Sequence, residues 1–201
     1  SPLDNLVVSV YRAFIIAQCH LGQGDLENAW GHAENALRQA ERYTGPQSTS
    51  GATLAPLLAE MAYERMNLDS LNTLLADRLE FIDRFGPPDA LSRCYTYLAR
   101  QALNDDMPHE AERLLEHAQR LAVSRGWQRP QALLLAEQAR VRLQRANYPG
   151  AEQLQRQLEQ LAAHATIDAE NPCQRAIAQH AIVSRSRLLL ASGQAPQASL
   201  L

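Results

Sequence analysis

Apolar residues recur along the chain at helical spacing, and glycine and proline interrupt them at intervals. The stretch from 108 to 125 shows the pattern of a helix that buries one face, with Leu114, Leu115, Ala118, Leu121 and Ala122. Proline and glycine stand where such stretches should begin and end. The pattern predicts nine helices and the start of a tenth, at 4–22, 25–43, 52–66, 69–85, 88–104, 108–125, 129–146, 149–165, 173–192 and 196–201.

The predicted helices form pairs that repeat about every forty residues. When the pairs are aligned on their internal turn, small residues coincide in the first helices, at Ala17, Ala59, Ala99, Ala139 and Ser186. Twelve positions later the second helices carry Ala29, Leu71, Ala111, Ala151 and Ala198. Small side chains allow two antiparallel helices to approach closely, and a pair must stack on its neighbours to bury its remaining apolar face. We therefore predict an all-α fold, a right-handed superhelical stack (solenoid) of about five antiparallel helix pairs.

This skeleton resembles the tetratricopeptide repeat, most closely in the first pair, which reads Ala17-x6-Gly24-Asp25-x3-Ala29-x6-Ala36. The period of forty or more residues is longer than the 34 of that family, which implies longer helices. In the second pair Leu71 and Arg78 replace small residues. That replacement predicts a wider or shifted helix crossing there.

Short segments also resemble the helical-repeat region of the MalT-like, ATP-dependent LuxR-type transcriptional activators. They are Ala62-Tyr63-Glu64-Arg65-x-Asn67-Leu68-Asp69, Ala111-Glu112-Arg113-Leu114-Leu115 with Arg125-Gly126-Trp127, and Ala139-x-x-Arg142-Leu143. The resemblance covers residues 10 to 195. It implies a module that lies between an ATPase domain and a helix-turn-helix domain, neither of which is in this sequence. Because both termini look cut, we expect residues 1–201 to be a single helical-repeat domain excised from a longer protein.

Composition excludes several classes of function. All 19 basic residues are arginine, so the chain holds no Walker A loop, pyridoxal Schiff base or lysine nucleophile. A net charge of −3 predicts no basic surface that would attract nucleic acid. No apolar run is long enough to span a membrane. The six histidines lack metal-binding spacing, and three widely separated cysteines fit a reducing cytoplasm. We expect no enzyme activity, no catalytic residue, no metal and no cofactor.

The candidate site is the inner, concave wall, which the first helices of stacked pairs line. The residue after each small crossing residue should face it, which selects Gln18, Glu60, Arg100, Arg140 and Arg187. One helical turn away lie Tyr11, Phe14, Tyr63 and Arg93. A ladder of arginines suits an anionic group, and the aromatic cluster could stack a ring or a sugar. The alternative is a wall that is simply solvated.

Two functions follow from these patterns. The first is a sensor module of a MalT-like regulator, which relays the binding of a small-molecule inducer or a regulatory protein to the missing domains. The alternative is a stand-alone tetratricopeptide-type adaptor that binds a protein or peptide in its groove. In either case we expect no direct contact with nucleic acid or membrane. Since 196–201 begins a helix with nothing after it, a weak homodimer through the C-terminal end is also expected.

Overall fold

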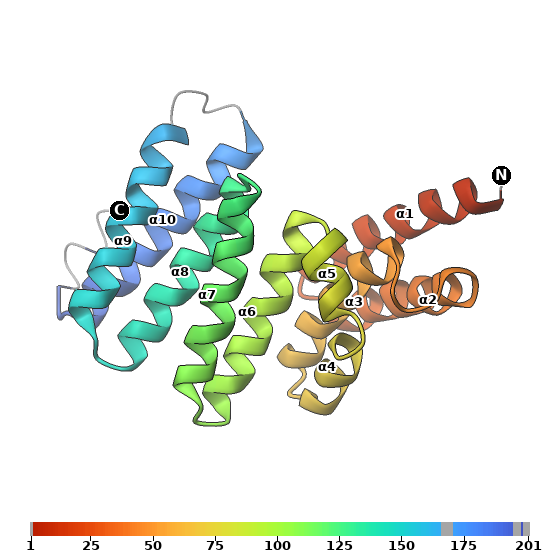
Figure 1. The fold of residues 1–201 in the computed structure, drawn as a ribbon, viewed down its shortest axis with the longest axis horizontal. Coiled ribbons are helices and arrows are strands. Elements are labelled where there is room, and N and C mark those ends of the chain that lie inside the picture. Colours follow the sequence, from red (N-terminus) through yellow and green to blue (C-terminus); the bar gives the residue numbers. More distant parts are fainter. Residues whose placement is uncertain (1, 166–170, 195–197, 199–201) are drawn as a thin grey trace. The chain divides into compact units, whose positions relative to one another are not determined.

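The computed structural model describes residues 2–165, 171–194 and 198, and all its regular elements in these ranges are helices (Figure 1). They are α1 (Pro2–Gly22), α2 (Leu26–Thr44), α3 (Thr49–Glu64), α4 (Leu68–Leu75), α5 (Leu79–Phe85), α6 (Pro88–Asn104), α7 (Pro108–Ser124), α8 (Gln128–Gln144), α9 (Tyr148–Ala165) and α10 (Pro172–Ala191). The all-α prediction is confirmed. None of the described helices is long and apolar enough to cross a membrane. The predicted helix at 196–201 falls largely outside the described residues.

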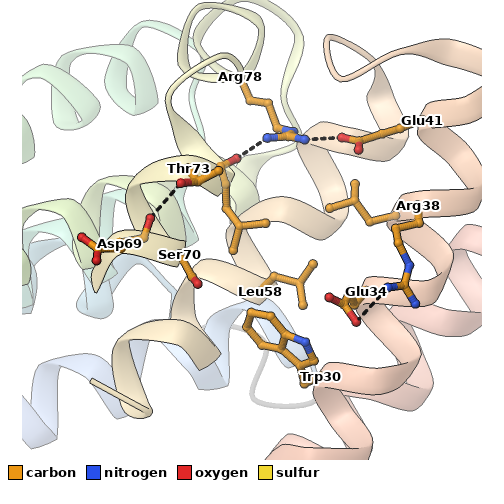
Figure 2. A pocket seen from close by; sticks show the side chains of 11 residues that line it. Trp30, Glu34, Arg38, Glu41, Leu58, Asp69, Ser70, Thr73 and Arg78 are labelled. Atoms are coloured by element: carbon orange, nitrogen blue, oxygen red, sulfur yellow. Dashed lines mark hydrogen bonds and ion pairs between the residues drawn. The ribbon is translucent and has the colours of Figure 1, made fainter. Parts of the chain in front are cut away.

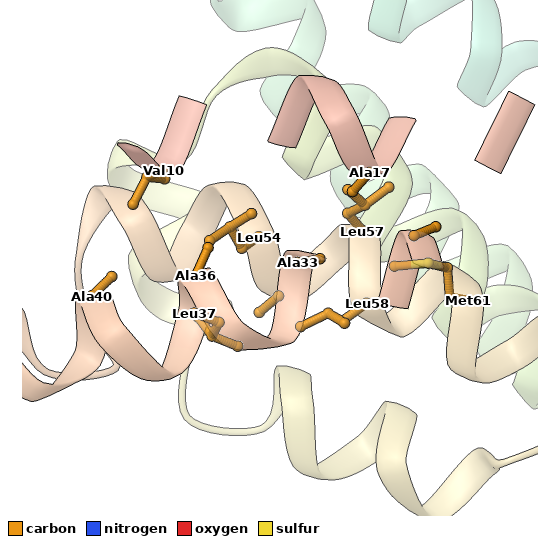
Figure 3. Packing of buried hydrophobic residues seen from close by; sticks show 12 residues of the cluster. Val10, Ala17, Ala33, Ala36, Leu37, Ala40, Leu54, Leu57, Leu58 and Met61 are labelled. Atoms are coloured by element: carbon orange, nitrogen blue, oxygen red, sulfur yellow. The ribbon is translucent and has the colours of Figure 1, made fainter. Parts of the chain in front are cut away.

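The chain divides into two compact units, Ser1–Tyr97 and Leu98–Leu201. The core of unit 1 lies where α1, α2 and α3 meet (Figure 3). Ala17, Ala29 and Ala59 are fully buried, as expected for small residues at helix crossings. Leucines of α3, among them Leu54 and Leu57, fill the space between the helices. Small residues set the approach of the helices, and larger ones provide the buried apolar area.

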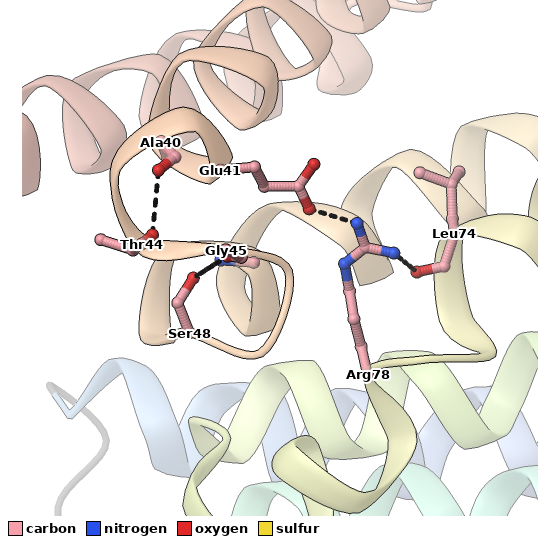
Figure 4. Close-up of polar contacts among 8 residues, drawn as sticks. Ala40, Glu41, Thr44, Gly45, Ser48, Leu74 and Arg78 are labelled. Atoms are coloured by element: carbon pink, nitrogen blue, oxygen red, sulfur yellow. Dashed lines mark hydrogen bonds and ion pairs between the residues drawn. The ribbon is translucent and has the colours of Figure 1, made fainter.

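The predicted helix at 69–85 is wrong in one respect, because the structure divides it into α4 and α5. Arg78 stands at the break, where its Nη1 donates to the Leu74 carbonyl at 2.6 Å and its Nη2 pairs with Glu41 of α2 (Figure 4). The side chain thus takes up a carbonyl that the end of α4 leaves without a helical donor. The predicted start at residue 69 is one residue late, since α4 begins at Leu68 and the Asn67 side chain accepts a hydrogen bond from the Ser70 N–H.

In unit 2, α7 packs on α8, α8 on α9 and α10, and α9 on α10. Its core contains Leu135, Leu158 and Ile177. Four of the predicted crossing residues are buried, namely Ala99, Ala111, Ala139 and Ala151. Ser186 departs from this pattern: it is only half-buried, and its hydroxyl donates to the Ile182 carbonyl of its own helix. On the same helix, Ile182 and Leu190 are exposed, whereas Leu188 is buried.

Six turns share one hydrogen-bonding scheme, in which a residue of positive φ follows the helix. Glycine occupies this position at Gly24, Gly126 and Gly193, but Met66, Asp106 and Ala146 adopt φ of 57°, 57° and 54° in the same role. In each turn the next residue donates its N–H to a carbonyl five positions back, as Asn147 does to Arg142. The repeated turn explains why helix ends occur at regular intervals even where glycine is absent.

Candidate functional site

The first helix of each pair contributes to one surface in each unit, which we call the first-helix face. In unit 1 it comprises α1, α3 and the part of α6 up to Tyr97; in unit 2 it comprises the rest of α6, α8 and α10. All the candidate residues predicted above lie on these helices. The two faces are described separately.

Glu60 of α3 is the centre of the unit 1 face. Its carboxylate lies 2.6 Å from Nε of Arg93 and accepts a hydrogen bond of 2.8 Å from the hydroxyl of Tyr97. Glu60 and Arg93 each keep about one fifth of the side chain exposed, 20% and 19%. The pair is therefore electrically neutral and lies at the edge of solvent, where a bound molecule can reach it.

Aromatic rings flank this ion pair. The ring centroids of Tyr63 and Tyr97 lie 5.4 Å apart, and the ring planes are tilted by 57° relative to each other. The Arg93 guanidinium lies 6.0 Å from the ring of Phe14 on α1, within cation–π range. The structure thus brings Phe14, Glu60, Tyr63 and Arg93 together.

Two other candidates on α1 do not join this cluster. Gln18 is half-buried, and no contact joins it to Glu60 or Arg93 among the interactions described. Tyr11 is 48% exposed and lies in an apolar stripe with Val7, Val8 and Ile15. The prediction grouped Tyr11 with Phe14 as one aromatic cluster, but their side chains have different surroundings.

Glu137 of α8 is the centre of the unit 2 face. Arg100 donates to it from α6 through Nε and Nη2, at 3.3 and 2.7 Å, and Arg140 donates through Nε at 2.8 Å. Glu137 is only 3% exposed. Burial alone would raise the pKa of this carboxyl, but hydrogen bonds from Arg100 and the charge of Arg140 more than offset it, and the pKa lies below its usual value. One buried carboxylate thus holds two guanidinium groups, and the cluster has a net positive charge.

The third predicted arginine lies apart from this cluster. Arg187 of α10 is exposed, and its charge acts on His180 of the same helix, as does the charge of Arg129. Burial is the main cause that lowers the pKa of His180, and the two arginines add to it while Glu137 opposes it. The ladder predicted from the sequence is therefore a pair, Arg100 and Arg140, with Arg187 as an outlying charge.

Glu137 was not among the predicted residues, although a signal for it exists. Tyr97 follows Glu60 by 37 residues, and Glu137 follows Arg100 by the same interval. Both contacts join the residue after a crossing alanine to the next first helix along the chain. Thirty-seven residues after Arg140 stands the buried, apolar Ile177, so Arg140 turns back to Glu137 instead.

Each face holds one guanidinium nitrogen that is buried and has no acceptor among the described residues. They are Nη1 of Arg93 in unit 1 and Nη2 of Arg140 in unit 2. Buried donors of this kind are uncommon in proteins, because each forgoes a hydrogen bond that water would supply. Because both nitrogens are shielded from solvent, an oxygen from another molecule or from water would reach them only after a shift of the arginine side chain.

Other chemistry is sparse. Among the described residues, no three His, Cys, Asp or Glu side chains come together as a metal site would require. Cys94 is completely buried, and burial raises the pKa of its thiol, with a smaller contribution from the charge of Asp83. A thiol in that state is a poor nucleophile.

The chain matches no protein-family model and no curated protein. Its fold is similar to two crystal structures of a putative kinesin light chain of Podosopora anserina with nearly identical tetratricopeptide-like repeats, one of them carrying a single substitution. In both comparisons the TM-score is 0.62 and the identity 18% over 94% of this chain, with 89% of the substituted chain and 90% of the other covered. The MalT-like resemblance stays a prediction. The helix pairs, their crossing residues and these structural neighbours together show a tetratricopeptide-like helical-repeat fold.

Proposed function

We propose that this chain is a protein-binding module of the adaptor type, and that each first-helix face binds an extended peptide segment. The observation that carries the proposal is that Arg93 and Arg140 are partly exposed, at 19% and 22%, and that each holds a guanidinium nitrogen without an acceptor among the described residues. Peptide carbonyl and carboxylate oxygens are the acceptors that such donors lack. The half-buried ring of Tyr63, which packs on the buried ring of Tyr97, offers apolar surface to a side chain of a peptide bound at unit 1.

The two faces differ in charge, so each favours a different kind of peptide. The unit 1 cluster is neutral because Glu60 balances Arg93. In unit 2, Arg100 and Arg140 share the single carboxylate of Glu137, so these three side chains together carry one net positive charge. We therefore expect a peptide bound at unit 1 to carry an apolar or aromatic residue, and a peptide bound at unit 2 to carry an acidic residue.

Selection from a random peptide library tests this proposal. Peptides selected on the chain would be synthesised, and their dissociation constants measured by calorimetry with Arg93→Gln and Arg140→Gln variants. Loss of a charged hydrogen bond should weaken binding by about tenfold or more. Arg120→Gln is the matched control, because Arg120 is exposed on α7, a second helix. Peptides that bind both variants as tightly as they bind the wild-type chain would contradict the proposal.

A sensor role in a MalT-like regulator is a more specific proposal than protein binding. The residues on which that resemblance rests have another explanation, which is structural. Asn67 caps α4, while Arg65 donates to the Leu26 carbonyl and covers the ring of Trp30. Arg142 and Arg145 both pair with Glu112. Because these residues build turns and helix contacts, any protein with such repeats would benefit from them. The complete gene discriminates: the regulator needs a phosphate-binding loop upstream and a helix-turn-helix downstream.

A further inference from the structure

A groove lies between α2 and α4 in unit 1, away from the first-helix face (Figure 2). Its volume is about 380 Å³, within the range of binding sites in proteins. Leu58 of α3 forms the floor, and Trp30, Leu37 and Leu74 supply further apolar surface. The proposed peptide site uses none of these residues.

The groove exists because α4 is short. This helix has 8 residues, whereas α2 beside it has 19, so much of α2 has no second helix of the next pair alongside. The ion pair of Arg78 with Glu41 closes one end (Figure 4). Leu71 and Arg78 replace the small residues of the repeat pattern in this pair. The structural result is a groove at a place where a longer second helix would pack in a regular repeat.

The shape of the groove suits a short helix. Five lining residues of α2, from Trp30 to Glu41, form a single stripe that extends for about 16 Å at 1.5 Å per residue. Arg38 and Arg78 are already paired, with Glu34 and Glu41. Asp69, exposed at the opposite rim, has no ion pair among the described residues. A helix with large apolar residues at i, i+3 and i+7 and one basic residue would match both the surface and the charge.

The same unit carries such a helix face. Val8, Tyr11 and Ile15 of α1 stand at i, i+3 and i+7 and are 68%, 48% and 59% exposed, and the exposed Arg12 lies among them. We call these four residues the α1 stripe. The opposite side of α1, with Val10 and Ala17, is buried against α2 and α3 (Figure 3). Since α1 is held in this way, its stripe cannot reach the groove of its own chain.

We propose that the α1 stripe of one copy of this chain docks in the α2–α4 groove of a second copy, and that the contact is reciprocal. Arg12 of each copy then lies beside Asp69 of the other. A reciprocal contact forms a closed two-fold dimer, the commonest symmetry of homo-oligomers. The Glu60 and Glu137 clusters take no part, so each copy in the dimer keeps both clusters available to a peptide.

A charge exchange tests the pairing directly. Sedimentation velocity on the wild-type chain should show a monomer–dimer equilibrium. Arg12→Glu and Asp69→Arg should each weaken self-association by at least about tenfold, because like charges then meet twice in the dimer. An equimolar mixture of the two variants should form a heterodimer, detectable by native mass spectrometry, because both contacts in it are again of opposite charge. Each variant must be folded to form it, so its appearance cannot be an effect of misfolding.

Two further variants locate the interface. Ile15→Asp, at an exposed position, should abolish association while circular dichroism stays unchanged. Leu190→Asp on α10 is the matched control, because Leu190 is similarly exposed, at 58%, and lies at the C-terminal end. A wild-type chain that stays monomeric at high concentration overturns the proposal. The proposal is also overturned if Leu190→Asp alone dissociates the dimer, because the interface would then lie at the C-terminal end. It is overturned as well if a mixture of the two charge variants forms no heterodimer.

Discussion

Replacement of Glu137 by glutamine should destabilise unit 2 more than any comparable change on the surface. The substitution keeps the size of the side chain but removes the negative charge that Arg100 and Arg140 share. Removal of one partner from a fully buried ion pair costs about 3–5 kcal/mol. The two arginines are 23% and 22% exposed, so water takes up part of their charge. We therefore expect a loss of about 2–3 kcal/mol.

Urea unfolding followed by far-UV circular dichroism measures this loss. Glu110→Gln is the matched control, because Glu110 pairs with Arg113 in the same unit but on an exposed helix surface. The control should cost less than about 0.5 kcal/mol. A double-mutant cycle of Glu137→Gln with Arg100→Gln should give a coupling of about 0.5–3 kcal/mol. If Glu137→Gln costs no more than Glu110→Gln, the buried carboxylate does not hold the helices together and the reasoning fails.

Three further predictions concern stability. The pKa of His180 is lower in the folded chain than its ordinary value of 6.5. The neutral His180 side chain therefore contributes fully to the free energy of unfolding above pH 6.5, and this contribution is lost as pH falls through the folded pKa. His180→Gln should make the fall of the urea midpoint in mild acid less steep. Gly51→Ala should lower the free energy of unfolding by about 1–3 kcal/mol, because the added Cβ would lie 2.4 Å from the Pro46 carbonyl oxygen. Gly31→Ala, which has open space around it, should raise that free energy by about 0.5–1 kcal/mol. Ala146→Gly should gain about 0.5–1 kcal/mol in thermal unfolding, because glycine relieves the left-handed turn at φ 54°.

The positions of most helices could be predicted because glycine or proline occurs where the helical spacing of apolar residues begins or ends. Residues 75–78 show the limit of that approach. The segment contains no glycine or proline, and the break depends on a contact between Arg78 and Glu41, 37 residues away. The start of α4 was misplaced for a related reason, since Met66 takes the left-handed conformation that glycine adopts in other turns of this chain.

The candidate site could be predicted in part. The register of crossing alanines placed Glu60, Arg100 and Arg140 on the correct helices. It could not identify Glu137, because a glutamate on a repeat helix is usually solvated, and its burial arises only when α6 and α8 pack together. Register gives the face of a helix, whereas the partner across the face depends on tertiary packing.

The polar contacts of the first-helix faces also bear on how the chain finds its correct order of helices. Most crossing residues are alanine, so many wrong neighbours would fit one another almost as well as the right ones. The charges remove this ambiguity. If α3 stacked on α8 in a misfolded chain, Glu60 would meet Glu137, and two carboxylates would be desolvated without a cation between them. The correct order gives each glutamate an arginine, from Arg93 in one case and from Arg100 in the other. These ion pairs therefore identify the correct neighbour of each helix, and they penalise out-of-order assembly even where they add little to the stability of the native fold.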